Sequence, residues 1–202
     1  MNNETGINDD RELSSYGYEL PEELIAQTPI IPRDRSRLLV VNSPKNCAHS
    51  FFHCLPDWLS SGDLLIFNDT RVIPARLYGF KTTGTKIEIL LLEEQKNNCW
   101  LALVKPGRKL PVGTEIYFNP KNDRSADGEK LKAKIIDRDE VTGGRILQFF
   151  IPSNQTWETV LEEYGHIPLP PYIFSTQSQP EQYQTVYAEK LGAIAAPTAG
   201  LH

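Results

Sequence analysis

The chain has 202 residues, 40% of them hydrophobic and 23% charged, which describes an ordinary globular protein long enough to bury a core. Its net charge of −5 argues against a protein that binds nucleic acid indiscriminately. However, residues 71–150 hold fifteen basic and ten acidic side chains, whereas residues 1–32 and 151–202 are acidic, so an anionic partner would approach the middle of the chain.

Residues 1–17 are polar and lack apolar periodicity, so we predict a disordered tail. The chain does not start with the basic segment and apolar core of a signal peptide. Its longest apolar runs also fall far short of the ~20 residues of a membrane helix. We therefore expect a cytoplasmic protein with no membrane partner, and we expect it to be a monomer.

Ordered structure is predicted from Tyr18 onward, where Pro21 suits the first turn of a short helix. An arginine cluster at residues 33–37 then precedes an apolar strand at residues 38–41. Two interpretations of the arginines stay open. They form either a solvated turn with an internal Asp–Arg pair or a contact to phosphate or carboxylate.

Cysteines and histidines gather at residues 47–54 and superficially resemble a metal cluster. Their spacing fits no familiar structural zinc pattern, and alternation predicts a strand at residues 48–52 instead. Cys47, Cys54 and Cys99 form no CxxC pair, which fits a reducing compartment better than a disulfide scaffold. We expect no metal.

Residues 63–67 form an apolar run, continuous enough for a strand buried on both faces, as in a parallel sheet. Asn68, Asp69 and Thr70 follow directly. Ligands gather beyond the carboxyl ends of strands in open α/β sheets, so this triplet is a candidate site. The alternative is an Asx-turn, which the same three residue types favour.

From residue 71 to residue 152, short strands alternate with turns, a pattern that predicts a small antiparallel barrel. The expected strands cover residues 71–77, 86–92, 100–104, 114–118, 130–136 and 145–151.

Basic side chains would give this barrel a positive face. If RNA binds, they are the expected phosphate contacts; the alternative is an ordinary solvated face. The candidates are Lys105, Arg108, Lys109, Lys130, Lys132 and Lys134.

Residues 155–164 have the amphipathic pattern of a helix. The proline-rich residues 168–172 must be extended, and a second short helix is expected at residues 181–190. Beyond it, small residues before His202 leave room for close packing or for a ligand.

Four stretches, taken in order, resemble the S-adenosylmethionine:tRNA ribosyltransferase-isomerase family of queuosine synthesis. They are YELPEELIAQTPIIPRDRSRLLV at residues 18–40, GDLLIFNDTRVIPARL at 62–77, GHIPLPPYI at 165–173, and YQTVYA followed by AIAAPTAGLH within 183–202. Members of that family continue well beyond the position of His202.

The resemblance and the strand pattern together predict the fold class, an open α/β domain interrupted by a small antiparallel β-barrel. We expect a discontinuous α/β domain of residues 18–70 and 153–202, incomplete at its C-terminal end, and an inserted barrel of residues 71–152.

The resemblance implies an enzyme that moves the ribosyl part of S-adenosylmethionine onto 7-aminomethyl-7-deazaguanine at the tRNA wobble position. Epoxyqueuosine forms, while adenine and methionine leave. The expected partners are therefore tRNA and S-adenosylmethionine, the latter as ribosyl donor, without a metal. Such chemistry needs a base near the carbon that the sulfonium acidifies and a proton for adenine. Asp69 and His202 are the candidates.

Other side chains in the matching stretches are candidate substrate contacts. Tyr183 and Tyr187 could stack on adenine or on a splayed base, or they could be two core aromatics on one helical face. The arginines could meet phosphate or ribose, or pair with carboxylates. The full set is Asn68, Thr70, Arg71, Arg76, Tyr172, Tyr183, Tyr187, Thr198 and Gly200.

Two further interpretations of the chain stay open. It could be a non-catalytic RNA-binding remnant that keeps the basic barrel. It could also fold poorly, because an incomplete α/β sheet exposes apolar edges.

Overall fold

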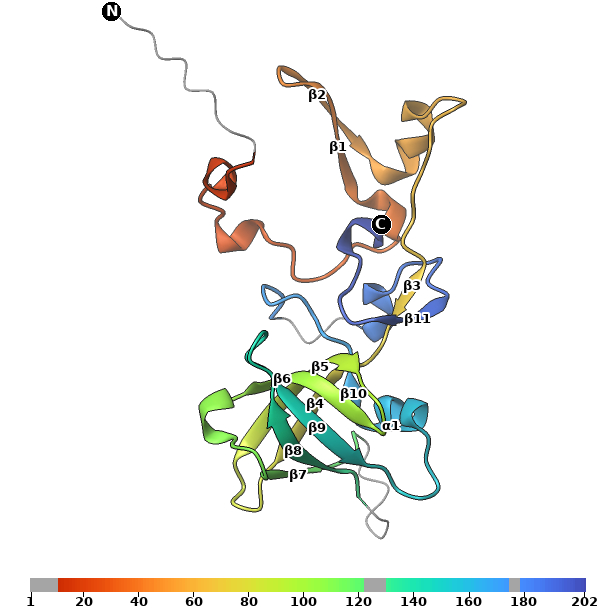
Figure 1. The fold of residues 1–202 in the computed structure, drawn as a ribbon. Coiled ribbons are helices and arrows are strands. Elements are labelled where there is room, and N and C mark those ends of the chain that lie inside the picture. Colours follow the sequence, from red (N-terminus) through yellow and green to blue (C-terminus); the bar gives the residue numbers. More distant parts are fainter. Residues whose placement is uncertain (1–10, 122–129, 175–178) are drawn as a thin grey trace, which may run out of the picture.

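The computed structural model describes residues 11–121, 130–174 and 179–202 (Figure 1). Residues 1–10 of the predicted tail lie outside the described residues. The rest of that segment contains one 3₁₀ turn, Leu13–Tyr16, whose side chains are all exposed. Among the described residues, no helix is long and apolar enough to cross a membrane.

Six antiparallel strands form the predicted barrel in the lower half of Figure 1. β4 pairs with both β5 and β7, and this second pairing closes the sheet. The strands, in their spatial order, are β4 (Arg76–Phe80), β5 (Lys86–Glu94), β6 (Cys99–Lys105), β9 (Arg145–Phe150), β8 (Lys132–Arg138) and β7 (Glu115–Phe118).

Alternating apolar side chains fill the barrel interior. Leu77, Ile89 and Ile135, for example, are fully buried, while the residues before and after each of them in its strand face outward. Gly79 sits where the barrel closes. A Cβ there would lie 2.6 Å from Ile116 Cγ2 and 2.9 Å from the Tyr117 carbonyl oxygen, so closure requires a glycine.

The predicted amphipathic helix is α1 (Trp157–Tyr164), and it packs against the barrel. Thr156 caps its first turn through a capping box. Trp157 stacks on Trp100 at 5.3 Å between ring centroids. After the helix, β10 (Gly165–His166) pairs with β4, and a Cβ on Gly165 would collide with backbone oxygens.

The upper half of Figure 1 contains a hairpin of β1 (Arg37–Ser43) and β2 (Asn46–Phe51), followed by the 3₁₀ segment Phe52–Trp58. Between this hairpin and the barrel lies a parallel pair, β3 (Thr70–Val72) with β11 (Lys190–Ala193). This parallel pair joins two segments far apart in the sequence. The predicted fold class, an open α/β region interrupted by a small antiparallel barrel, is confirmed.

The prediction of a buried strand at residues 63–67 is wrong. The segment is extended but belongs to no sheet, and Leu64 and Ile66 are 83% and 87% exposed. An apolar run can become a buried strand only where other strands lie beside it. None of the described residues forms such a neighbour.

The predicted helix at residues 181–190 is also wrong. The chain forms one 3₁₀ turn, Pro180–Tyr183, and then runs to β11. The backbone carbonyls of Glu181 and Gln184 accept hydrogen bonds from Arg33, so tertiary contacts take carbonyls that a helix would use internally. Near Pro21 the expected helix is reduced to one 3₁₀ turn, Glu22–Leu24. Further 3₁₀ turns cover Arg33–Arg35, Gly107–Lys109 and Thr198–Gly200.

Candidate functional site

Three of the four stretches that carry the family resemblance meet at one cleft of about 420 Å³, which we call the arginine cleft. The first stretch contributes three arginines, and the third contributes the extended proline-rich segment. The last stretch contributes residues from its beginning and from its end. Among the residues that line the cleft are Arg33, Arg35, Arg37, Tyr172, Tyr183, Thr198 and His202.

Arg33 forms part of the wall of this cleft, and its guanidinium bonds backbone carbonyls. Its Nη1 donates to the carbonyl of Gln184 at 2.5 Å, and its Nη2 donates to the carbonyl of Glu181 at 2.7 Å. The side chain of Gln184 in turn bonds both backbone groups of Val72, at 2.9 Å and 2.8 Å. Arg33 therefore ties the C-terminal segment to β3 and to the first stretch.

Gln27 holds the proline-rich segment in the same way. Its Nε2 donates to the carbonyl of Tyr172 at 2.9 Å, and its Oε1 accepts from the backbone N–H of Phe174 at 2.8 Å. Pro168, Pro170 and Pro171 have no backbone N–H with which to pair in a sheet. The side chain of Gln27 therefore supplies the contact that a neighbouring strand would otherwise give.

The arginine cleft suits an anionic group. Arg35 and Arg37 are exposed at its rim, and none of the described residues that line it is acidic. Between them the Ser36 hydroxyl is buried and has no hydrogen-bond partner among the described residues. Planar guanidinium groups with a spare hydroxyl match the oxygens of a carboxylate or a phosphate.

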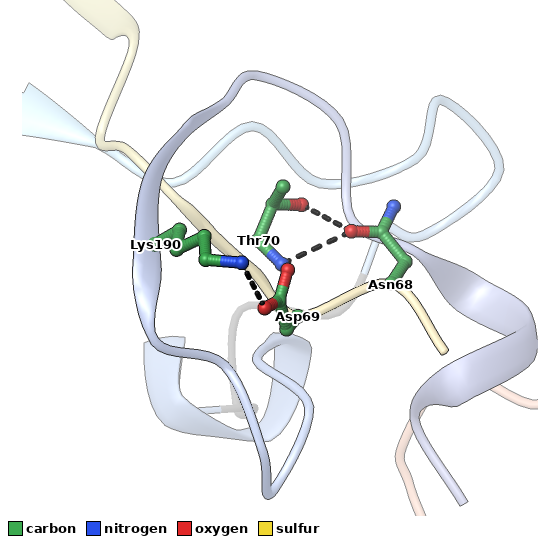
Figure 2. A network of polar contacts seen from close by, with 4 residues as sticks. All are labelled: Asn68, Asp69, Thr70 and Lys190. Atoms are coloured by element: carbon green, nitrogen blue, oxygen red, sulfur yellow. Dashed lines mark hydrogen bonds and ion pairs between the residues drawn. The ribbon is translucent and has the colours of Figure 1, made fainter. Parts of the chain in front are cut away.

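Asn68, Asp69 and Thr70 lie at the parallel strand pair (Figure 2). The Asn68 Oδ1 accepts from the Thr70 N–H at 3.0 Å and from its hydroxyl at 2.5 Å, the Asx-turn considered as the alternative. Asp69 points instead to Lys190, with 2.7 Å between Oδ2 and Nζ. This hydrogen bond lowers the pKa of the Asp69 carboxyl, which therefore stays ionised at neutral pH.

His202 lies in the arginine cleft, with its ring 5.7 Å from that of Phe52 and its Nδ1 3.4 Å from the Ala199 carbonyl. Asp69 does not line that cleft. The two candidate acid–base residues therefore do not share one cavity: His202 lies in the arginine cleft, and Asp69 lies at the parallel strand pair.

The two tyrosines make contacts within the fold. Tyr183 is buried, while Tyr187 meets Phe67 edge-on at 5.1 Å and donates to the Gly200 carbonyl at 3.4 Å. A Cβ on Gly200 would lie 2.6 Å from the Tyr187 hydroxyl. Small size at residue 200 thus makes room for a tyrosine.

Arg71 and Arg76 line a second cleft, of about 760 Å³, between β4, α1 and the parallel pair. Arg76 Nε lies 3.3 Å from Glu88 Oε1, an ion pair without hydrogen-bond geometry. His166 also lines this cleft. Burial, with the charges of Lys121 and Arg76, lowers the pKa of its imidazole, so the ring is neutral at pH 7.

The predicted phosphate contacts come from two parts of the barrel. Lys105 and Arg108 lie at the connection from β6 to β7, and Lys130, Lys132 and Lys134 lie on or just before β8. All five are exposed. The side chain of Lys109 lies outside the described residues.

Sequence reasoning missed Gln27, Gln184, His166 and Lys190. Lys190 did carry a signal, because it is the only basic residue between 151 and 202. Within the described residues, no three His, Cys, Asp or Glu side chains gather as metal ligands would.

The family model for queuosine biosynthesis proteins matches residues 13–202. Proteins named S-adenosylmethionine:tRNA ribosyltransferase-isomerase are similar along nearly the whole chain. That of Nostoc sp. is 53% identical over 96% of this chain and 53% of its own length, and that of Thermosipho melanesiensis is 48% identical over 95% and 53%. The chain thus spans about half the length of the curated relatives it matches.

A solved structure, the S-adenosylmethionine tRNA ribosyltransferase of Thermotoga maritima, is 44% identical to this chain. The superposition covers 65% of this chain and 43% of the other, with a TM-score of 0.31.

Proposed function

The chain belongs to the queuosine biosynthesis protein family, and we propose that it transfers and isomerises the ribosyl part of S-adenosylmethionine onto the 7-aminomethyl-7-deazaguanine of tRNA. Epoxyqueuosine would form, with release of adenine and methionine. The observation that carries this proposal is the meeting of three family stretches at the arginine cleft. With tRNA as substrate, the protein would work in the cytoplasm.

In this proposal the arginine cleft holds the anionic part of a substrate through Arg35 and Arg37, which face no carboxylate among the described lining residues. Asp69, ionised at neutral pH and paired with Lys190, takes the proton from the ribose carbon next to the sulfonium. His202 gives a proton to the departing adenine. The attacking amine must be neutral, since only its lone pair can form the new bond.

Adenine release tests the function directly. The 202-residue chain is incubated with S-adenosylmethionine and with tRNA that carries the aminomethyl-deazaguanine base, and free adenine is quantified. We expect release only when that tRNA is present. A folded chain that releases none would refute the proposal for these residues.

The second candidate is an RNA-binding protein without turnover. The exposed lysines on β6 and β8 favour it, because they can contact phosphates whether or not the chemistry proceeds. Salt-dependent tRNA binding without consumption of S-adenosylmethionine would be its signature.

Asp69→Asn and His202→Ala should each reduce turnover by about 10²–10⁴-fold, the usual contribution of a general acid or base. Binding of tRNA should change little. Asp63→Asn and His49→Ala are matched controls, because both side chains are exposed and line neither cleft. Unchanged turnover in both test variants would remove these residues from acid–base roles.

A further inference from the structure

Five side chains from five neighbouring strands stand in direct register across the barrel, and we call them the outer row. The cross-strand pairs are Lys86 with Phe80, Phe80 with Tyr117, Tyr117 with Lys132, and Lys132 with Phe150. Strands lie about 4.8 Å apart, so the outer row runs for roughly 19 Å around the outside of the barrel, across five of its six strands.

The outer row lies on the surface of the barrel. Its sequence neighbours Gly79, Ile87, Ile116 and Ala133 are buried inside, and side chains alternate between the two faces of a strand. Lys86 and Lys132 are exposed, Phe150 is 53% exposed, and Phe80 and Tyr117 are half-buried. The rings of Phe80 and Tyr117 are therefore partly exposed between two cations, and that of Phe150 lies beyond Lys132.

Contacts within the outer row show how aromatic and basic groups interleave. The rings of Phe80 and Tyr117 are 6.4 Å apart and tilted by 31°. Lys132 Nζ lies 5.9 Å from the centroid of the Tyr117 ring, within cation–π range. On the same face of β4, half-exposed Tyr78 meets His166 edge-on at 5.1 Å.

The two nearby carboxylates both have partners, and one of these partners belongs to the outer row. Glu88 pairs with Arg76, and Glu115 accepts a hydrogen bond from the Tyr117 hydroxyl at 2.8 Å. No acidic residue stands in the outer row itself. The outer row thus contains two lysines and no carboxylate, in the part of the chain that is basic overall.

Cross-strand aromatic pairs also stabilise sheets, and this would explain Phe80 beside Tyr117. It does not explain why Lys86 and Lys132 flank them, nor why Phe150 continues the row with half of its surface exposed. Alternating aromatic and basic side chains are the arrangement by which proteins bind single strands: bases stack on the rings and phosphates meet the cations.

We propose that the outer row is a binding platform for single-stranded nucleic acid, with bases on Phe80, Tyr117 and Phe150 and phosphates on Lys86 and Lys132. The proposal deepens the proposed function, because it assigns a surface to an unpaired loop of the RNA substrate. Stacking needs unstacked bases, so the platform should prefer single strands to duplexes and should read little sequence.

The test is fluorescence anisotropy of a labelled twelve-nucleotide oligouridine titrated with the 202-residue chain, without S-adenosylmethionine. Phe150→Leu and Tyr117→Leu keep an apolar side chain but remove the ring, and each should weaken binding about tenfold. Lys132→Gln should reduce the salt dependence of log K by about 0.7. Phe51→Leu and Lys45→Gln change exposed residues of the β1–β2 hairpin, outside the barrel. These two controls should leave oligouridine binding unchanged.

Each outcome decides the question independently of catalysis. Weaker binding in the outer-row variants supports the platform even if adenine is never released. Binding that these variants leave unchanged, or the absence of oligouridine binding, overturns it even if turnover is normal, and a protein partner would then be the occupant to seek. Phe150→Leu keeps the test valid if Tyr117→Leu impairs folding, because Phe150 is more exposed than the half-buried Tyr117.

Discussion

Arg145→Met should lower the free energy of unfolding by about 3–5 kcal/mol, because it removes several charge-assisted hydrogen bonds at a buried position. Arg145 is buried, and its guanidinium donates to four backbone carbonyls, at distances of 2.9–3.1 Å. These carbonyls belong to Gly107, Leu110, Gly143 and Gly144. The arginine therefore fastens two loops at one end of the barrel.

Chemical denaturation followed by circular dichroism measures this effect. Arg138→Met is the matched control: it lies directly opposite Arg145 in the β8–β9 register but is exposed, so its loss should change stability by no more than about 0.5 kcal/mol. Equal effects of the two substitutions would mean that the carbonyl contacts of Arg145 do not stabilise the fold.

Arg145 also holds a loop that carries a candidate RNA contact. Gly107 and Leu110 flank Arg108, one of the proposed phosphate contacts. Lysine at residue 145 keeps the charge but cannot reach four acceptors with a fixed fork. Arg145→Lys should therefore recover part of the stability while leaving the loop that carries Arg108 less well held.

Most of the barrel could be predicted from the sequence because its signals are local. Alternation at residues 86–92 and 145–151, with turn residues between strands, corresponds to β5 and β9 within a few residues. The strands predicted at residues 38–41 and 48–52 correspond to β1 and β2, but their pairing as a hairpin was not predicted. Each strand carries its own period, and most pairings in the barrel join neighbours in the chain, the exceptions being β6 with β9 and β4 with β7.

The misplaced elements depend on distant partners. Residues 63–67 have the composition of a buried strand, but burial requires neighbours that the segment itself does not specify. Residues 181–190 have helical spacing, yet Arg33, about 150 positions away, takes the carbonyls of Glu181 and Gln184. Local periodicity contains no information about such contacts.

The arginine cleft could not be assembled from sequence for the same reason. The motifs identify which stretches matter, but not that Gln27 clamps the proline-rich segment or that Gln184 bonds Val72. Glutamine has no distinctive pattern, so its role emerges only from the contacts. The arginines at residues 33–37 also divide their roles: Arg33 is structural, whereas Arg35 and Arg37 face the cleft.

Because Arg33 supports the C-terminal segment, its replacement should have a second large effect. In Arg33→Met, the C-terminal segment loses two short charge-assisted hydrogen bonds, at 2.5 Å and 2.7 Å. Local opening of residues 181–201 should become easier by about 2 kcal/mol, which is roughly 30-fold faster amide hydrogen exchange there. Adenine release should fall as well, because Tyr183 and Thr198 lie in that segment and His202 follows it directly.

Arg35→Met separates support from ligand contact. Arg35 lines the same cleft without touching the carbonyls that Arg33 binds, so exchange of residues 181–201 should match that of the unaltered chain. Affinity for the anionic substrate should nevertheless fall, since a guanidinium facing that group is lost. Hydrogen exchange by mass spectrometry, run beside S-adenosylmethionine and tRNA binding, measures both properties. If Arg33→Met leaves exchange unchanged, or if Arg35→Met accelerates it equally, the two arginines do not have the separate roles that their contacts indicate.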